Sequence, residues 1–380
     1  MCSTSSEHAA TWVEVDLSAV RDNVRRLRAL AAPAALMAVV KADAYGHGLV
    51  PVARAALQGG AEWLAVARVE EGTALRVSGI KAPILVLSEP PSAAVGALLA
   101  ARLTPAAYTA RFLRDLDRAV AATGGPPVEV HLKLDTGMRR VGAGPETWGD
   151  MFRMARGMRQ LRVGALWSHL AVANQPGHPF TRHQAEQFAR GVRLARSLDL
   201  RPPRLHLCNS AATLSCPELH YDLVRTGLAI YGLEPAPGLA DGLGLRPALA
   251  WYSRLGLVKA VPAGEPVGYG LHWRPARDTV VGTLPVGYGD GLRRGPDGHA
   301  RLAWRGRTVP LAGAVSMDQA VVDLGPHASA ESQGDRVVVI GSSGSARVTA
   351  DDWARWWGTI SYEVVCTIGA RVARVHLDQV

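Results

Sequence analysis

Lysine is scarce in this chain of 380 residues. Only four of the 42 basic residues are lysines (Lys41, Lys81, Lys133 and Lys259), and the others are arginines. A Schiff base formed by a side-chain amine would therefore have four possible positions. The net charge is +9, but the arginines are spread along alanine-rich segments without a dense basic block. This pattern argues against a nucleic-acid partner and is compatible with an anionic small molecule.

Long apolar runs and patterned cysteines are also missing. No stretch approaches the ~18 uncharged apolar residues of a membrane span, and the first residues lack the basic and apolar regions of a signal peptide. The four cysteines, Cys2, Cys208, Cys216 and Cys366, form no CxxC or Cys/His pattern. A disulfide framework or a metal site is therefore not expected. We expect a cytoplasmic protein with no membrane partner.

Apolar runs alternate with helical segments through roughly the first 230 residues. The expected strands are 35–40, 63–67, 83–87, 102–106, 128–134, 163–167, 204–208 and 227–232. Helical spacing is found at 17–30, 69–79 and 182–198. About eight such units predict a parallel sheet closed into a (β/α)8 barrel of the TIM type. An open doubly wound sheet is the alternative, but no GxGxxG motif follows the first strand.

From about residue 241 the pattern changes to short β-rich runs broken by Gly, Pro and Asp, with one helical stretch at 349–357. This predicts a mostly antiparallel β domain. The sequence thus indicates an α/β protein with a barrel over 1–240 and a β-rich domain over 241–380. The early run 12–16 is a candidate for packing on the second domain.

Two of the lysines lie at the carboxyl ends of expected barrel strands, where such barrels carry their catalytic side chains. Lys41 directly follows the strand 35–40, and Lys133 lies near the end of the strand 128–134. A structural ion pair with a nearby acid, Asp43 or Asp135 respectively, is the alternative for each.

Two further segments could hold a phosphate. Asn209 and Ser210 lie where a strand leads into a helix, and Gly227 is expected just before the last barrel strand. A helix cap and an ordinary turn are the alternatives. Together with a lysine at a strand end, these segments suggest a phosphorylated aldehyde cofactor, with pyridoxal 5'-phosphate as the natural candidate.

The segment AVVKADAYGHG (38–48) resembles the cofactor-lysine motif of alanine racemases. Further matches follow in the order of that family and cover nearly the whole chain: LKLDTGMRRVG (132–142), WSHLAVAN (167–174), HLCNSAAT (206–213), VRTGLAIYG (224–232), PAGEPVGYG (262–270), LPVGYGDG (284–291), VSMDQ (315–319) and TISYEVVC (359–366).

The resemblance implies a racemase that uses two bases. Lys41 would hold the cofactor as a Schiff base and act on the D-enantiomer, while Tyr269 from a second subunit would act on the L-enantiomer. A free tyrosine has a pKa of ~10, and His169 is the family's candidate for assisting it. Arg225 would face the pyridine nitrogen and donate without protonating it, which disfavours transamination. An ion pair between Arg225 and Asp222 is the alternative.

The resemblance implies roles for other residues as well. The cofactor site would include Tyr45, Asn209, Ser210, Gly227, Leu228 and Tyr362. Arg140 and the backbone N–H of Met317 would bind the substrate carboxylate, and Tyr288 would line the entrance from the partner chain. Lys133 matches a lysine that is carbamylated in many members. The family also implies a homodimer with its active sites at the subunit interface.

Five positions depart from the family pattern: Arg139 replaces a glycine, Thr226 a proline, Gly289 an alanine, Ser316 a cysteine and Ala373 a proline. If the first of these positions needs a positive φ, Arg139 is strained there and the placement of Arg140 is affected.

The expected function is interconversion of L-alanine and D-alanine, which supplies D-alanine for peptidoglycan. A racemase of serine or of broader specificity is the alternative within the same chemistry, because small pocket changes discriminate weakly. A non-catalytic cofactor-binding protein is expected to lack both the second domain and Tyr269. A decarboxylase of basic amino acids is expected to have an acidic partner for the pyridine nitrogen, where this chain offers Arg225.

Overall fold

The computed structural model describes residues 9–294 and 299–378, and the chain divides into two compact units. The barrel unit comprises residues 18–44 and 48–246. The described part of the sheet unit comprises residues 9–17, the segment Tyr45–His47, and residues 247–294 and 299–378. The segment that follows Lys41 therefore leaves the barrel unit for three residues and returns to it at Gly48.

Eight parallel strands form the sheet of the barrel unit. In sheet order they are β8 (Arg204–His206), β7 (Leu161–Trp167), β6 (Val128–Lys133), β5 (Thr104–Ala107), β4 (Ile84–Val86), β3 (Trp63–Val66), β2 (Ala35–Val39) and β9 (Leu223–Thr226). The end strands approach each other, since Asp222 N donates to Leu205 O (3.1 Å). Arg225 N donates to Cys208 O (3.0 Å). The sheet is thus nearly closed, which confirms the predicted (β/α)8 barrel.

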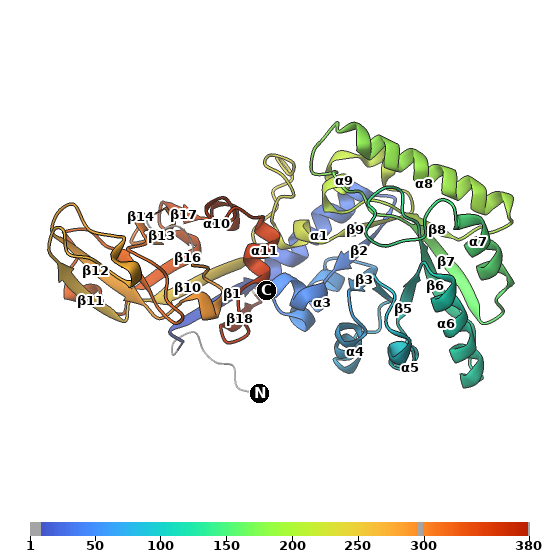
Figure 1. Ribbon diagram of the computed structural model, residues 1–380, viewed down its shortest axis with the longest axis horizontal. Coiled ribbons are helices and arrows are strands. Elements are labelled where there is room, and N and C mark those ends of the chain that lie inside the picture. Colours follow the sequence, from blue (N-terminus) through green and yellow to red (C-terminus); the bar gives the residue numbers. More distant parts are fainter. Residues whose placement is uncertain (1–8, 295–298, 379–380) are drawn as a thin grey trace. The chain divides into compact units, whose positions relative to one another are not determined.

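Helices lie on the outside of the barrel strands, as α4 to α8 show in Figure 1. The helices and 3-10 turns of this region are α1 (Leu17–Ala31), α3 (Leu49–Gln58), α4 (Val69–Val77), η1 (Ser92–Ala94), α5 (Val95–Ala100), α6 (Ala110–Thr123), α7 (Trp148–Gly157), α8 (Pro179–Ser197), α9 (Ser210–Ser215), η2 (Pro217–Leu219) and η3 (Leu228–Tyr231). In α6, Thr109 caps the first turn by accepting from Phe112 N (3.1 Å). Its buried residues Phe112, Leu113, Leu116 and Val120 recur at helical spacing, which gives the helix one apolar face for the barrel.

The last barrel strand lies earlier in the chain than the sequence predicts. The run 227–232 was expected as a strand, but β9 precedes it and the 3-10 turn η3 occupies it. All of η3 is buried, and the Tyr231 hydroxyl donates to Val39 O (3.0 Å). A short buried apolar run looks the same in a strand and in such a turn, so periodicity does not separate them. Gly227 therefore follows a barrel strand instead of preceding one.

The sheet unit contains two sheets. The larger has the order β14 (Arg307–Pro310), β13 (Arg301–Trp304), β16 (Arg336–Ser343), β10 (Leu249–Arg254), β1 (Thr11–Asp16) and β18 (Ala373–Leu377), with β17 (Ala346–Val348) paired to β16. The smaller has the order β11 (Leu257–Val261), β12 (Thr279–Leu284) and β15 (Ala320–Asp323). All pairs are antiparallel except β1 with β18, which confirms the predicted mostly antiparallel architecture.

Short helical elements complete the sheet unit: η4 (Tyr269–Leu271), η5 (Tyr288–Asp290), η6 (Ala330–Ser332), α10 (Ala350–Trp357) and α11 (Ser361–Cys366). Helix α10 lies in the predicted helical stretch, and Thr349 caps it by accepting from Asp352 N (3.0 Å). The early run 12–16 forms most of β1 and pairs with β10 and β18.

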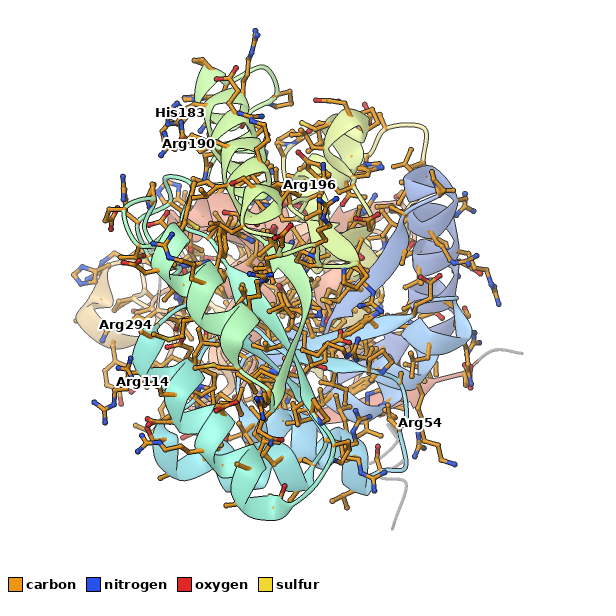
Figure 2. All side chains as sticks on the ribbon, turned by 90° about the vertical axis from the view of Figure 1, so that its right-hand side faces the viewer. Arg54, Arg114, His183, Arg190, Arg196 and Arg294 are labelled. Carbon is orange, nitrogen blue, oxygen red and sulfur yellow. The ribbon has the colours of Figure 1, made fainter. Side chains whose placement is uncertain are left out.

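Within the described ranges, no helix is long and apolar enough to cross a membrane. Basic side chains on the barrel unit are dispersed, as Figure 2 shows for Arg54 on α3, Arg114 on α6, and Arg190 and Arg196 on α8. The positive charge of this surface is therefore distributed over several helices.

Candidate active site

Lys41 lies at the carboxyl end of β2 and begins an unusual turn, α2 (Lys41–Gly46). Residues 42–45 have φ between 52° and 53°, so the turn is left-handed. This conformation costs about 1–2 kcal/mol per residue for L-amino acids, and backbone strain of this kind clusters at functional sites. The fold thus holds an unfavourable backbone directly after one lysine.

Two carboxylates hold this turn in the barrel unit. Glu71, in the first turn of α4, accepts from Ala42 N (2.6 Å). Asp43 Oδ1 accepts from Leu49 N (2.7 Å), which links the turn to the start of α3. These bonds fix the backbone that positions Lys41.

Tyr45 belongs to the sheet unit and lies beside Tyr362, with ring centroids 6.0 Å apart and planes tilted by 43°. Burial, followed by the nearby Tyr362 and Cys366, raises the pKa of Tyr45 above its ordinary value. Burial also raises the pKa of Tyr362. Both hydroxyls therefore keep their protons at neutral pH and can donate to an anion.

Arg225 is buried in β9, with 3% of its surface exposed. Its Nη1 donates to His206 Nδ1 (3.0 Å), and its Nη2 donates to Ser168 O (2.8 Å) and Leu207 O (3.1 Å). Nη2 also lies 3.2 Å from His169 Nδ1. Burial lowers the pKa of Arg225 to about 10, so the guanidinium remains charged at neutral pH.

Arg225 forms no ion pair with any described residue, and its Nε–H has no hydrogen-bond acceptor among them. Asp222, its possible partner from the sequence, instead accepts from Leu205 N (2.8 Å). A guanidinium donates hydrogen bonds without giving up its proton. An aromatic ring nitrogen placed at this Nε–H would therefore receive a hydrogen bond and stay unprotonated.

Lys133 is buried at the end of β6, and its Nζ lies 4.1 Å from the centroid of the Trp167 ring. Burial, followed by the charges of Arg225, Arg140 and Lys41, lowers the pKa of Lys133 to about 7. Much of the Lys133 population is thus a neutral amine near pH 7.

His169 is half-buried at the end of β7. Burial, followed by the charges of Arg225 and Lys133, lowers the pKa of His169 well below its ordinary value. Its imidazole is therefore neutral at physiological pH and can accept the hydrogen bond from Arg225 through Nδ1.

Asp135 organises the loop that carries Arg140. Its Oδ1 accepts from Gly137 N (2.9 Å) and Arg139 N (3.1 Å), and it forms no ion pair with Lys133 in the described structure. Arg139 has a φ of 56°, so the position at which the resembled family pattern has glycine does use the left-handed region. Arg140 is exposed and has no ion-pair partner among the described residues, which leaves its charge for an anionic ligand.

Ser210 begins α9, and its buried Oγ accepts from Gly227 N (2.8 Å) and Ala229 N (3.4 Å). Its hydroxyl proton has no acceptor among the described residues. The side chain of Asn209 serves as the helix cap considered from the sequence, since its Oδ1 accepts from Ala212 N (3.1 Å). Ser210 is thus the member of this pair whose side chain can donate to an anion.

Two buried polar atoms next to these groups lack partners. Trp167 Nε1 and Thr226 Oγ1 form no hydrogen bond with any described residue. An unsatisfied buried polar group costs about 1–3 kcal/mol. Buried polar atoms are ordinarily paired, so these two indicate a polar ligand or water in the interior of the barrel.

The sheet unit presents Tyr269, Tyr288 and Met317 on exposed loops, with 69%, 44% and 55% of their surfaces exposed. The last two loops are joined, since Tyr288 N donates to Ser316 O (3.0 Å) and Gly289 N donates to Met317 O (2.8 Å). Large apolar surface at neighbouring loops is typical of an interaction site.

Arg371 locks these two loops together. Its Nε and Nη2 donate to both oxygens of Asp290 (2.7 and 3.1 Å), and Nη2 also donates to Asp318 (2.7 Å). These hydrogen bonds raise the pKa of Arg371. The loop of Tyr288 and the loop of Met317 are therefore held as one rigid surface.

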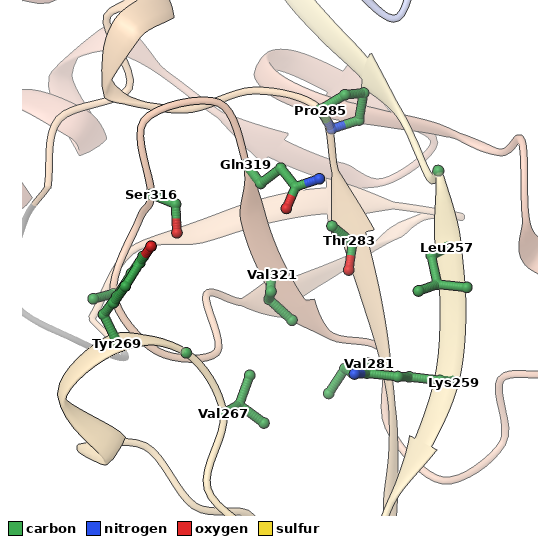
Figure 3. Close-up of a pocket in the computed structure, with 13 residues that line it drawn as sticks. Leu257, Lys259, Val267, Tyr269, Val281, Thr283, Pro285, Ser316, Gln319 and Val321 are labelled. Atoms are coloured by element: carbon green, nitrogen blue, oxygen red, sulfur yellow. The ribbon is translucent and has the colours of Figure 1, made fainter.

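A pocket of about 690 Å³ opens on the sheet unit beside Tyr269. Figure 3 shows Tyr269 and Ser316 at one side of it and Lys259, on β11, at the other. Its floor is formed by strands of the smaller sheet, including Val281 and Val321. The tyrosine thus stands at the rim of a cavity of ligand size.

The barrel unit combines a lysine at a strand end, a serine that can bind an anion and a buried arginine with a spare donor. This combination is typical of a (β/α)8-barrel enzyme with a lysine at the carboxyl end of a strand. Family models for the alanine racemase N-terminal domain and C-terminal domain match residues 15–235 and 248–376. The chain belongs to the alanine racemase family, and it is thus an isomerase of the racemase class.

Relatives support this assignment along the whole chain. The chain is 44% identical to an alanine racemase of Symbiobacterium thermophilum over 96% of this chain and 97% of that protein. It is 42% identical to one from Frankia casuarinae over 96% and 95%. The crystal structure of alanine racemase from the D-cycloserine producer Streptomyces lavendulae superposes with a TM-score of 0.93 at 40% identity, covering 98% of both chains.

Sequence reasoning missed three polar residues behind Arg225: Glu129, His131 and His206. Glu129, His131 and Lys133 occupy every second position of β6, so all three share one face of the strand. This alternation of polar residues in an otherwise apolar barrel strand is the signal that could have identified them.

Proposed function

We propose that the chain racemises alanine by a two-base reaction that depends on pyridoxal 5'-phosphate. The observation that carries the proposal is Arg225, which is buried, has no acidic partner among the described residues and keeps a free Nε–H. Bound pyridoxal phosphate supplies an electron sink that makes the substrate Cα–H acidic. An arginine at its ring nitrogen limits that sink, which favours return of the proton to Cα and disfavours transamination.

Residues of this chain fit such a cofactor. Lys41 supplies the amine that binds it, because its position is fixed by the strained turn after β2. Ser210, with the backbone around Gly227 and Leu228, receives the phosphate, since the Ser210 hydroxyl retains an unused proton. The family resemblance adds Tyr45 and Tyr362 as further phosphate ligands, and burial keeps both hydroxyls protonated at neutral pH.

The two bases act on opposite faces of Cα. The neutral Lys41 amine removes the α-proton of the D-enantiomer and its ammonium form returns one. Tyr269 removes the α-proton of the L-enantiomer as the phenolate and returns one as the hydroxyl. One proton leaves Cα and one arrives in each turnover, so the reaction is balanced. His169, neutral and bonded to Arg225, assists the tyrosine. Arg140 and the Met317 N–H orient the substrate carboxylate.

We propose that two copies of the chain form each active site, with the partner's sheet unit supplying Tyr269 and Tyr288. A catalytic tyrosine needs a site shielded from water, but Tyr269 is 69% exposed in the single chain. Its loop neighbour Leu271 is 56% exposed and Met317 55%, which gives this region an apolar surface for a second copy.

Lys133 is proposed to carry a carbamate formed with carbon dioxide. The neutral amine is the reactive form, and burial together with nearby positive charges places its pKa at about 7. The reaction forms an N–C bond and releases one proton, giving an anion next to Arg140. Mass spectrometry under native conditions and ¹³C NMR with labelled bicarbonate would show a carbamate in the wild type. The absence of the carbamate signal in both measurements would contradict this assignment.

The D-alanine so produced is proposed to feed peptidoglycan synthesis in the cytoplasm. Cys208, Cys216 and Cys366 form no disulfide with one another, which is compatible with a reducing compartment.

The reaction is tested with purified protein loaded with pyridoxal phosphate. We expect the wild type to form D-alanine from L-alanine, and Lys41→Ala to lose both the reaction and the absorbance band of the covalently bound cofactor. Tyr269→Phe should bind the cofactor normally but lose mainly the exchange of the L-alanine α-proton with deuterated water. Equal loss of exchange from both enantiomers in Tyr269→Phe would contradict the assignment of the two bases.

A further inference from the structure

A row of buried polar groups runs from Arg225 into the interior of the barrel. His206 Nδ1 lies 3.0 Å from Arg225 Nη1, and His206 Nε2 lies 3.2 Å from His131 Nδ1. His131 Nε2 lies 3.2 Å from Glu129 Oε1. Both histidines are fully buried. We refer to Arg225, His206, His131 and Glu129 as the relay chain.

The chemistry of its two ends fixes the direction of every hydrogen bond in the relay chain. A guanidinium only donates, so His206 Nδ1 must accept from Arg225. A neutral His206 then carries its proton on Nε2 and donates to His131 Nδ1. His131 in turn carries its proton on Nε2 and donates to the carboxylate of Glu129, which only accepts. All three bonds are satisfied with both histidines neutral.

The surroundings of the histidines support this neutral arrangement. Burial lowers the pKa of His131, and burial followed by the charge of Arg225 lowers the pKa of His206 well below its ordinary value. The ring of His206 stacks on Trp167 at 5.3 Å with planes 10° apart, and the His131 ring lies 5.1 Å from that of Trp63. The imidazoles therefore have little freedom to rotate.

Two arginines hold Glu129 at the end of the relay chain that lies farthest from Arg225. Its Oε2 accepts from Arg162 Nη2 (2.7 Å), and its Oε1 also accepts from Arg204 Nη1 (3.2 Å). The hydrogen bond from His131 is the largest cause of a lowered pKa at Glu129, so the carboxylate stays ionised and keeps its role as acceptor.

We propose that His131 and Glu129 are positioning residues that act on Arg225 through His206. The carboxylate fixes the tautomer of both histidines, so that His206 always presents a bare Nδ1 to the guanidinium. Arg225 is then held in one orientation, with its free Nε–H presented to the cofactor. The contact between Arg225 and the cofactor rests on the proposed function. The directions of the hydrogen bonds in the relay chain do not.

The proposal predicts coupling between two residues that share no contact. Glu129→Leu removes the last acceptor and should weaken binding of pyridoxal phosphate roughly 10- to 100-fold, the effect of losing a hydrogen bond to a charged group. Glu129→Gln keeps an acceptor oxygen for His131 and should restore most of that affinity. In an Arg225→Lys background, Glu129→Leu should have less than about a twofold effect, because the link to the cofactor is already cut.

Glu89→Leu is the matched control. Glu89 is also a half-buried carboxylate of the barrel unit, but it accepts from Thr109 N and Thr109 Oγ1 instead of a histidine. Its loss should lower thermal stability without any coupling to Arg225. Equal effects of Glu129→Leu in the wild-type and Arg225→Lys backgrounds, or coupling as large for Glu89→Leu, would overturn the proposal.

A second measurement does not depend on the cofactor. ¹⁵N NMR of ring-labelled histidine should show His131 and His206 as neutral Nε2–H tautomers in the protein without cofactor, and Glu129→Leu should change the tautomer of His131. A wild-type Nδ1–H tautomer or a charged ring at either position would overturn the relay chain. If the wild type fails to bind pyridoxal phosphate, the proposed function fails while this result still decides the hydrogen-bond order.

Discussion

Replacing Gly46 by alanine tests how the turn after Lys41 is seated. Gly46 has a φ of 78°, and a Cβ atom there would lie 2.4 Å from the backbone oxygen of Val365. The carbonyl of Gly46 also accepts from Arg374 Nε (3.2 Å), so this residue cannot move away freely. The substitution therefore strains the backbone and forces a shift against α11, the helix that carries Tyr362.

The expected destabilisation has two parts. A left-handed alanine costs about 1–2 kcal/mol, and overpacking against backbone adds about 1–3 kcal/mol. Gly79 separates these parts, because it has a φ of 89° but a Cβ there would meet nothing within 4 Å. Gly79→Ala should show the first part alone, so Gly46→Ala should be the more damaging of the two by the overpacking part.

The assay is thermal unfolding of the purified protein together with titration of pyridoxal phosphate. Gly46→Ala should lower the apparent melting temperature by several degrees more than Gly79→Ala does. It should also weaken cofactor binding, because Tyr45 is its chain neighbour and lies against Tyr362. Gly79→Ala should leave the affinity unchanged. If the two variants have the same melting temperature and bind the cofactor equally well, the close contact between Gly46 and Val365 has no energetic role.

Three further outcomes are expected. Ser210→Ala should raise the dissociation constant of pyridoxal phosphate roughly tenfold, since one hydroxyl donor to the phosphate is lost; an unchanged constant in equilibrium dialysis would contradict the anion site. Lys133 has a pKa of about 7 in the folded state against 10.5 when unfolded. In buffer free of carbon dioxide, the wild type should therefore gain stability relative to Lys133→Met as pH rises from 7 to 10, by about 1.4 kcal/mol per pH unit. If urea unfolding curves of the two proteins shift in parallel with pH, the low pKa is refuted. Arg139→Gly should raise the melting temperature while Arg139→Ala should not, because only glycine relieves the φ of 56°; a gain from alanine would assign the effect to the side chain.

The barrel could be predicted because its strands are buried on both faces and end abruptly at polar residues. The run that ends at Lys41 is an example, since four of the five residues of β2 are buried and the polar segment begins directly afterwards. The prediction was wrong at the last strand because β9 contains Arg225, a charged residue at a position that is buried in the structure. A charged functional residue inside a core strand interrupts the apolar run by which such a strand is recognised in the sequence.

The candidate site was predictable only as far as its residues lie in motifs or at strand ends. Glu129, His131 and His206 lie within strands, where a polar residue in a short run carries little signal of its own. These residues meet because of the register of the strands. Leu132 of β6 pairs with Leu166 of β7, and Leu166 pairs with Leu205 of β8. That alignment brings distant polar residues together inside the barrel, and no single segment of the sequence contains it.

The few lysines of this chain can be related to the chemistry that arginine cannot perform. Arginine cannot supply a neutral amine near pH 7, because its pKa stays above about 12 unless it is buried. A chain biased towards arginine must nevertheless keep lysine wherever an amine has to lose its proton. Lys81, which is exposed, shows that scarcity alone does not identify such a place. Position at the end of a barrel strand is the second requirement, and Lys41 and Lys133 both meet it. Burial and nearby positive charges lower the pKa of Lys133 to about 7. Lys41 is one of those charges, so it makes the neutral form of Lys133 more accessible.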